Sequence, residues 1–301
     1  MLFSNRGFDF RVQADIENVN EIENAIEKGA KGIGILRTES LYQDKEYNEE
    51  EQYQYYRQVF AQGGNNPITI RTFDGGSTVQ PFGLWGIRNS IANPDTFQGQ
   101  LRAVLRASEG YNVRIAIPGV ADIEQFKWAK EQLHLVRKQL SEQGFTYNAN
   151  TPLGIMVEIP SLVISLEMLT HEVNFYIVDA DKLLKYLMAL DTDGPMLTQL
   201  TDPMHPALLR AIKQIIDVKP ENPLDVMVCG AITEYKQVLP IFKGIGIAGI
   251  AVRSDKISDT LKVIDKLDAE NAARIAAKAL VLSSADRIRT YVDSALDKLG
   301  I

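Results

Sequence analysis

Short apolar runs rich in β-branched residues alternate along the chain with longer stretches in which apolar residues recur at helical spacing. This alternation is typical of strand–helix–strand units around a parallel sheet. It predicts eight strands, at residues 10–15, 32–38, 68–74, 113–119, 153–159, 175–180, 225–230 and 247–253. It predicts helices between them, at residues 18–29, 48–61, 97–109, 122–143, 161–171, 182–190, 204–217 and 233–243, followed by a helical region from residue 255.

Eight strands with eight crossovers in 301 residues predict an α/β protein with a (β/α)8 TIM barrel, a fold that typically needs ~250 residues. An open, doubly wound sheet is the alternative. No Ser/Gly/Pro-rich linker and no low-complexity tract divides the chain, so we expect one domain over residues 1–301. The Ala-rich, amphipathic C-terminal segment predicts two helices that close the barrel or cover a subunit interface.

Charge and cysteine content narrow the class of protein. The chain has 32 Lys and Arg against 39 Asp and Glu, a net charge of −7 that argues against a nucleic-acid-binding protein. No apolar run approaches the ~18 residues that span a bilayer, and the N-terminus lacks the apolar core of a signal peptide. The single cysteine, Cys229, cannot form an intramolecular disulfide. These features predict a mature cytoplasmic protein without a membrane anchor.

Polar residues gather where the predicted strands end. In a parallel barrel the carboxyl ends of the strands open into one mouth, and catalytic residues come from there. We therefore take as candidates the polar side chains at the ends of strands two, three, five, six and seven, which are Arg37, Arg71, Asp74, Glu158, Asp179, Asp181 and Cys229.

Two arginines facing one cavity would suit a phosphate or a carboxylate. Internal ion pairs, Arg37 with Glu39 or Arg71 with Asp74, account for the same residues equally well. Glu158 ends the most apolar strand, where a carboxylate is either a ligand for a hard metal ion or the partner of an arginine.

The remaining reactive side chains are ambiguous or unpromising. A lone cysteine such as Cys229 after an apolar run is more often a packed small side chain than a catalytic group. His134 lies in a charged helical segment, and His171 lies near a helix end. His205, just before a helix, is expected to be a capping or loop residue and not a base. No His-rich metal motif, nucleophile elbow or P-loop lysine motif is present.

Six segments, in their order along the chain, resemble one known family. They are AIEKGAKGIGILRTESLY, IRTFDGG, QLRAVLRAS, LGIMVEIPS, DPMHPALLRAIKQII and MVCG. Together they resemble the phosphoenolpyruvate-binding barrel of enzyme I, the phosphoenolpyruvate–protein phosphotransferase of the bacterial sugar phosphotransferase system, which is related to pyruvate phosphate dikinase. The likeness covers nearly the whole chain.

The resemblance implies a barrel that binds phosphoenolpyruvate with Mg²⁺ and passes its phosphoryl group to a histidine on a separate swivelling domain, usually as a homodimer. By position, Arg37 and Arg71 match the family's phosphate-binding arginines, and Arg88 matches a further arginine of the pocket. Glu158 matches one of two metal-binding carboxylates. Cys229 matches the cysteine that donates a proton to the pyruvate enolate.

Five positions in or near that pocket depart from the family pattern. Lys182 stands where the second metal-binding aspartate is expected, and Asp181 replaces the asparagine before it. Thr78 replaces a lysine and Thr192 an arginine. The family's GWRAIR reads LWGIR, which is one residue shorter and lacks the first arginine.

Exchanging a carboxylate for an ammonium shifts the local charge by about two units toward positive, which disfavours a dication but not an anion. We therefore expect Mg²⁺ to bind weakly or not at all, with Lys182 paired to Glu158 in its place and contributing to the substrate site. Asp181 is the alternative metal ligand, although a one-residue shift at a strand end normally points a side chain elsewhere.

These departures favour a divergent, catalytically impaired phosphotransferase barrel that cannot transfer phosphate alone, because the swivelling phosphohistidine domain is not among these residues. A separate phosphohistidine domain is then a possible partner, beside phosphoenolpyruvate or a similar small anion. The alternatives are a non-catalytic module that senses an anion or binds a protein, and a metal-dependent lyase of the wider phosphoenolpyruvate/pyruvate superfamily. The lyase would need two metal-binding carboxylates and meets the same objection.

Overall fold

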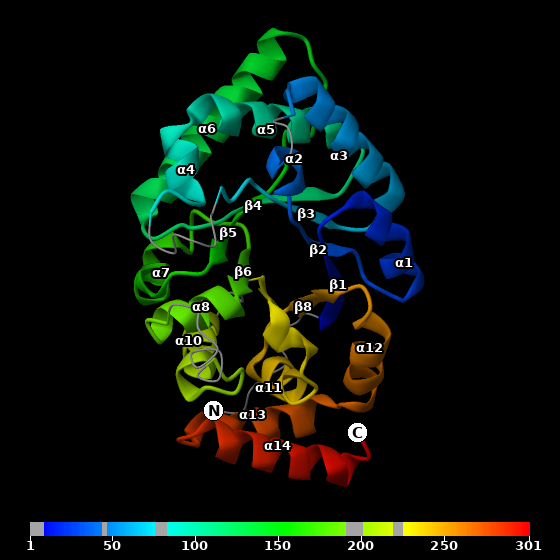
Figure 1. Ribbon diagram of the computed structural model, residues 1–301, viewed down its shortest axis with the longest axis vertical. Coiled ribbons are helices and arrows are strands. Elements are labelled where there is room, and N and C mark those ends of the chain that lie inside the picture. The colour runs from blue at the N-terminus through cyan, green and yellow to red at the C-terminus, as the bar shows by residue number, and fades with distance from the viewer. Residues whose placement is uncertain (1–8, 44–46, 76–82, 191–200, 219–224) are drawn as a thin grey trace.

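The computed structural model describes residues 9–43, 47–75, 83–190, 201–218 and 225–301. Eight parallel strands form a closed barrel in which each strand pairs with its neighbours in sequence and β8 pairs with β1 (Figure 1). The predicted TIM barrel is confirmed, and the open sheet is wrong. The strands are β1 (Arg11–Ile16), β2 (Ile33–Leu36), β3 (Ile68–Arg71), β4 (Val113–Ile117), β5 (Leu153–Val157), β6 (Tyr176–Asp179), β7 (Val226–Cys229) and β8 (Gly249–Arg253).

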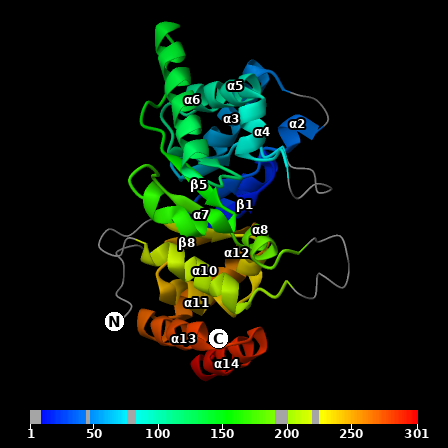
Figure 2. The same ribbon diagram turned by 90° about the vertical axis from the view of Figure 1, so that its left-hand side faces the viewer.

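Helices surround the barrel on its outer face (Figure 2). The first half of the chain contributes η1 (Val19–Glu21), α1 (Ile22–Glu27), α2 (Ser40–Gln43), α3 (Glu49–Gly63), α4 (Ile87–Ala92), α5 (Pro94–Ala107) and α6 (Ile123–Glu142). The second half contributes α7 (Pro160–Ser165), η2 (Leu166–Leu169), α8 (Ala180–Leu187), α10 (Pro206–Asp217), η3 (Ala231–Glu234), α11 (Val238–Ile245), α12 (Ile257–Lys266), α13 (Ala269–Val281) and α14 (Ala285–Leu299). Of the two roles expected for His205, capping or loop residue, the structure has the first: its Nδ1 accepts a hydrogen bond from the Ala207 N–H at the start of α10. None of the described helices has the length and apolar character needed to cross a membrane.

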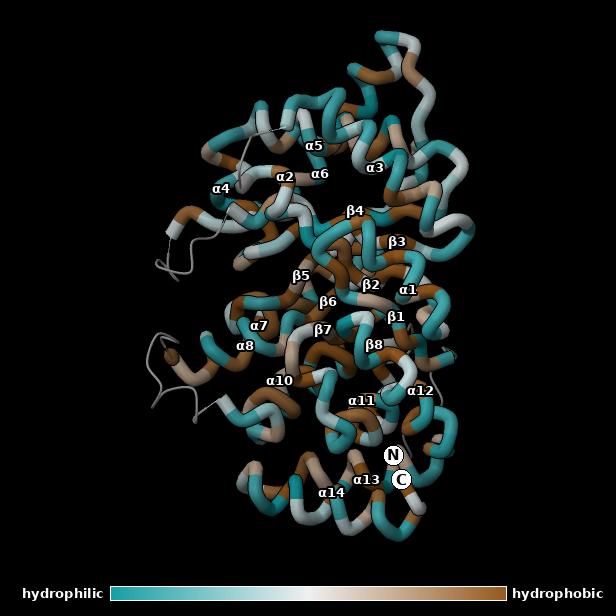
Figure 3. Tube along the Cα trace, turned by 45° about the vertical axis from the view of Figure 1, so that its right-hand side comes forward, coloured by the Kyte–Doolittle hydropathy of each residue, from teal (hydrophilic) through white to brown (hydrophobic). Residues whose placement is uncertain are grey.

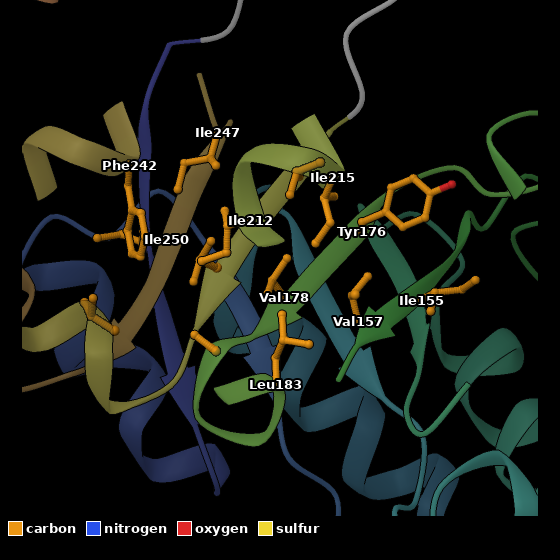
Figure 4. Close-up of a cluster of buried hydrophobic side chains, with 14 of the residues drawn as sticks. Ile155, Val157, Tyr176, Val178, Leu183, Ile212, Ile215, Phe242, Ile247 and Ile250 are labelled. Carbon is orange, nitrogen blue, oxygen red and sulfur yellow. The ribbon is translucent and has the colours of Figure 1, made fainter. Parts of the chain in front are cut away.

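Side chains alternate between the two faces of the barrel strands, as the period of a β-strand requires. The outward residues pack under the helices: Figure 4 shows Val157 and Val178 on the strands beside Leu183 of α8 and Ile212 of α10. The tube in Figure 3 is mostly hydrophobic along the strands and more hydrophilic along the outer helices. The barrel interior is filled by a separate buried cluster of Ile35, Ala116, Met156, Phe175, Ile177, Met227, Cys229 and Ala251.

This alternation decides which polar residues reach the mouth. Met156, Ile177 and Met227 face inward, so Asp179 and Cys229, two residues further along their strands, and Glu158, directly after β5, face inward as well. The fold thus projects these side chains into a common space at the carboxyl ends of the strands.

The two helices predicted at the C-terminus are α13 and α14, but they do not close the barrel. Closure comes from the pairing of β8 with β1, and α13 packs on α11 at the outer end of the molecule (Figure 1). Gly244 of α11 permits this contact, because a Cβ there would collide with the backbone of Ala272 in α13. The expected cover of a subunit interface stays a prediction.

Candidate functional site

The mouth is organised around Lys182, in the first turn of α8. Its Nζ donates hydrogen bonds to Asp74 Oδ2 at 2.6 Å and to Glu158 Oε1 at 2.9 Å. The same ammonium lies 4.6 Å from the ring centroid of Trp85, a cation–π distance. An ammonium has three N–H donors, and two carboxylates and one aromatic face account for all three directions.

Local structure fixes the direction of this lysine. Asp179, the last residue of β6, caps α8 by accepting a hydrogen bond from the Lys182 backbone N–H at 3.1 Å. The helix therefore begins immediately at the strand end, and the Lys182 side chain reaches Asp74, which follows β3, and Glu158, which follows β5. The predicted pairing of Lys182 with Glu158 is present.

Glu158 is completely buried, and its Oε2 accepts a hydrogen bond from the Gly119 N–H at 2.5 Å. Burial raises the pKa of Glu158 to about 7, because an enclosed carboxylate loses its hydration; attraction to Lys182 opposes this shift. Burial also opposes the charge of Lys182, but Glu158 and Asp74 together raise the pKa of the lysine above its ordinary value. At Asp74 the attraction of Lys182 and Arg71 outweighs burial and lowers the pKa.

An aromatic pair covers the cluster. The rings of Trp85 and Tyr186 are stacked, with centroids 6.0 Å apart and 10° between their planes. Trp85 also lies against Gly119, where an added Cβ would be 3.0 Å from the indole. Glu158 is thus fully enclosed, while 29% of the Lys182 side chain stays exposed, so the pair is partly shielded from water and its attraction is strengthened.

Arg71 is the most deeply buried of the candidate arginines, with 4% of its side chain exposed. It forms an ion pair with Glu39, and its NH1 lies 3.7 Å from Asp74 Oδ2. Burial disfavours the charge, but Glu39 and Asp74 raise the pKa of the guanidinium. The predicted Arg71–Asp74 pair is confirmed. Two buried polar atoms of this segment, Arg71 Nε and Thr72 Oγ1, have no hydrogen-bond partner.

Arg37 follows β2 and binds Asp15 through two parallel hydrogen bonds of 2.8 and 2.7 Å. The predicted pair of Arg37 with Glu39 is wrong, because Glu39 is bound to Arg71. Asp15 was not predicted as a site residue, although it lies at the end of a predicted strand in the same way as the others. Arg37 and Arg71 are thus each already paired with a carboxylate of the chain.

Cys229 is the last residue of β7 and is completely buried in the barrel interior. Burial raises the pKa of the thiol well above its usual value, and the nearby carboxylates Asp179 and Asp15 act in the same direction. The sulfur is therefore held as a neutral thiol, which can donate a proton but is a poor nucleophile.

Two other predicted residues lie apart from the Lys182 cluster. Asp181 Oδ2 accepts a hydrogen bond of 2.6 Å from the Ala231 N–H after β7 and is not among the partners of Glu158. Arg88 lies in α4, close enough to Tyr186 to act on its charge state. Thr78 and Thr192 lie outside the described residues.

A divalent metal ion does not fit those side chains of the mouth that the structure describes. Glu158 and Asp74 are both committed to the Lys182 ammonium, and Asp181 is directed at the backbone after β7. Over the described ranges, no three His, Cys, Asp or Glu side chains converge into a group able to hold a metal ion. The charge that a dication would supply beside Glu158 is supplied by Lys182.

Known proteins resemble this chain over most of its length. The model of the family described as "PEP-utilising enzyme, PEP-binding domain" matches residues 2–269. The chain is 31% identical over 295 residues to a multiphosphoryl transfer protein of Escherichia coli O6:H1, covering 93% of this chain and 36% of that protein. It is 31% identical over 300 residues to a phosphoenolpyruvate-protein phosphotransferase of Geobacillus stearothermophilus, covering 95% and 52%. The chain thus spans between a third and about half of the length of these relatives.

Solved structures support the fold alone. A citrate lyase from Burkholderia xenovorans superposes with a TM-score of 0.56 at 13% identity, over 100% of this chain and 95% of that one. A lead(II) complex of malate synthase from Haloferax volcanii superposes with the same score at 12% identity, over 85% of this chain and 73% of that one. Because the family model covers most of the chain, this protein belongs to the PEP-utilising enzymes, within the family of their PEP-binding domain.

Proposed function

We propose that this barrel is a divergent enzyme I-like domain that binds phosphoenolpyruvate or a similar small anion without Mg²⁺ and is impaired in phosphoryl transfer. The observation that carries the proposal is the position of the Lys182 ammonium between Asp74 and Glu158. A glutamate with an ammonium has the same net charge as two carboxylates with a dication. The local field beside the arginines is therefore retained while the metal is dispensable.

Arg37 and Arg71 are the groups we assign to the anion, with Arg88 at the rim. The buried Nε of Arg71 has no protein partner, which leaves a donor for a ligand oxygen. A bound anion must compete with Asp15 and Glu39 for the guanidinium groups, so the expected affinity is weak. Lys182 acts on the ligand through its charge, because its own donors are engaged.

The impairment follows from what phosphoryl transfer requires. Metal ions normally bridge the phosphate oxygens and neutralise the charge that develops on them, whereas a tethered ammonium provides one charge at a fixed position. The neutral thiol of Cys229 remains suited to protonate an enolate, as the family resemblance implies. We propose that residues 1–301 act as one cytoplasmic domain, as a homodimer, and that any phosphohistidine is supplied by a separate domain.

Calorimetric titration with phosphoenolpyruvate, in the presence and absence of Mg²⁺, tests the proposal. We expect phosphoenolpyruvate to bind with the same dissociation constant in both conditions and Mg²⁺ alone to give no heat of binding. Tight binding that depends on Mg²⁺ would contradict the metal-independent site. An absence of phosphoenolpyruvate binding in both conditions would refute the anion-binding role.

A pair of substitutions at one position separates charge from structure. Lys182→Asp restores the second carboxylate of the family pattern and is expected to create measurable Mg²⁺ affinity, since hard cations prefer carboxylate oxygens. Lys182→Asn removes the ammonium without adding a carboxylate and should bind Mg²⁺ more weakly than Lys182→Asp. Equal Mg²⁺ affinity in the two variants would show that position 182 does not control the metal.

A non-catalytic sensor remains the second candidate. The pairing of Arg37 and Arg71 with internal carboxylates favours it, because these guanidinium groups are engaged before any ligand binds. A metal-dependent lyase is disfavoured by the engagement of both Asp74 and Glu158 with Lys182. The calorimetric experiment distinguishes the lyase from the sensor by its dependence on Mg²⁺.

A further inference from the structure

Gln100, in the segment QLRAVLRAS of α5, is completely enclosed and uses its whole side-chain amide in hydrogen bonds. Its Oε1 accepts from the Phe73 N–H at 2.8 Å. Its Nε2 donates to Thr38 Oγ1 at 3.1 Å and to the Tyr56 hydroxyl at 3.0 Å. One amide therefore connects the segment after β2, the segment after β3 and helix α3.

Thr38 completes the connection. Its hydroxyl donates a hydrogen bond of 2.9 Å to the backbone carbonyl of Arg71 while accepting from Gln100. Thr38 is itself fully buried and directly follows Arg37. Phe73, the other contact of Gln100, lies two residues after Arg71. The network thus reaches both arginine-bearing segments within one or two residues of the guanidinium side chains.

The backbone alone does not explain the spacing of these segments. The register of β2 and β3 is irregular between Ile33 and Leu36, and their paired residues end with Leu36 opposite Ile70. Beyond that point the Arg37 N–H binds Ile16 of β1 and the Thr72 N–H binds Ala116 of β4. The two segments are therefore tied to opposite neighbours, and the Thr38–Gln100 hydrogen bonds link them to each other.

We propose that Gln100, acting through Thr38, is a positioning residue that sets the separation of Arg37 and Arg71 and so their joint fit to an anion. The effect on ligand affinity rests on the proposed anion-binding function. The effect on the positions of Arg37 and Arg71 does not depend on that function. Small displacements of positioning groups can change binding and rate strongly. The network lies behind the mouth, so its members need not contact the ligand.

The test compares substitutions that preserve volume with matched controls. Gln100→Met removes three hydrogen bonds, and Thr38→Val removes the bridging hydroxyl while keeping the side-chain shape. Thr38→Ser retains the hydroxyl and is the conservative rescue. Gln98→Met, on the same helix, removes a hydrogen bond of 2.8 Å to Gln132 on α6 and is the control for a general loss of polar contacts.

Two measurements are made on each variant: the ¹⁵N–¹H resonances of the Arg37 and Arg71 Nε groups by NMR, and phosphoenolpyruvate affinity by calorimetry. We expect Gln100→Met and Thr38→Val to shift the arginine resonances and to weaken the affinity by about fivefold or more, with Thr38→Ser and Gln98→Met close to the parent chain. If Gln100→Met does not fold, the Thr38→Val and Thr38→Ser pair decides the question.

The outcomes separate this inference from the proposed function. Unchanged arginine resonances in both Gln100→Met and Thr38→Val would overturn the positioning role, as would equal effects of Thr38→Ser and Thr38→Val. If the parent chain binds no phosphoenolpyruvate, the proposed function fails. Shifts of the arginine resonances in Gln100→Met and Thr38→Val would still support the positioning role in that case.

Discussion

The ammonium of Lys182 forms ion pairs with two carboxylates at the mouth, those of Asp74 and Glu158, and is the positive charge that they share. Removing one partner of a buried ion pair leaves an uncompensated charge, which is strongly destabilising. We therefore expect Lys182→Met to lower the free energy of unfolding by about 3 kcal/mol at pH 8. Urea denaturation measures this loss, and Lys185→Met on the same helix is the matched control.

The loss in Lys182→Met should depend on pH in a defined direction. Burial already raises the pKa of Glu158 to about 7, and removing the ammonium raises it further. A carboxyl group with a raised pKa binds protons more tightly in the folded chain, so stability returns as pH falls from that pKa toward the unfolded value of ~4.3. The destabilisation should be clearly smaller at pH 5.5 than at pH 8. The same loss at both values would indicate a packing effect.

At Cys229, in contrast to Lys182, the surroundings disfavour the charged form of the side chain. Burial raises the pKa of its thiol, so the thiolate that reacts with alkylating agents is scarce in the folded chain. We expect little modification by iodoacetamide at pH 8 in native buffer and complete modification in urea, both followed by mass spectrometry. Rapid alkylation of the native protein would show that the thiol is accessible and ionised.

At the scale of elements, alanine substitutions at two helical glycines are expected to change stability in opposite directions. A Cβ at Gly244 of α11 would collide with the backbone of Ala272, so Gly244→Ala forces α11 and α13 apart and should destabilise the protein by about 2 kcal/mol. A Cβ at Gly99 of α5 meets no atom within 4 Å, so Gly99→Ala should stabilise the protein by roughly 0.5–1 kcal/mol through helix propensity. Thermal unfolding of both variants checks the signs. Equal effects would mean that the contact of α11 with α13 does not constrain this position.

The alternation of strand and helix periods predicted the barrel because the strands are short, almost wholly buried runs and the crossovers between them have helical stripes. The same regularity placed Glu158 and Cys229 at the mouth. The partners of the arginines were less predictable: Asp15 reaches Arg37 from the neighbouring strand, and such a contact depends on three-dimensional register. Trp85 was also missed as a site residue, because its role arises only when α8 brings Lys182 beneath its ring.

At the scale of the whole molecule, the two ends of the barrel carry different charge networks. The mouth holds the Lys182 cluster, while the amino end is tied by Asp225, which forms ion pairs with Arg11 of β1 and Arg114 of β4. Arg114 also donates to Thr69 at 2.9 Å and lies 4.4 Å from the ring centroid of Phe175. Stability is typically built at this end of a TIM barrel and chemistry at the other.

Asp225→Asn tests whether the amino end of the barrel contributes to stability without contributing to anion binding at the mouth. It removes the counter-charge shared by Arg11 and Arg114, and we expect it to lower the free energy of unfolding by about 2–3 kcal/mol. Asp259→Asn, which breaks an exposed pair with Lys262, should leave the free energy of unfolding close to that of the parent chain. Phosphoenolpyruvate affinity should be unchanged in Asp225→Asn at a temperature where the variant is folded, because strands of four to six residues separate the substitution from the mouth. A loss of phosphoenolpyruvate affinity in the folded variant would contradict this expectation. It would mean that the ion pairs of Asp225 influence Arg37 and Arg71 at the opposite end of the barrel.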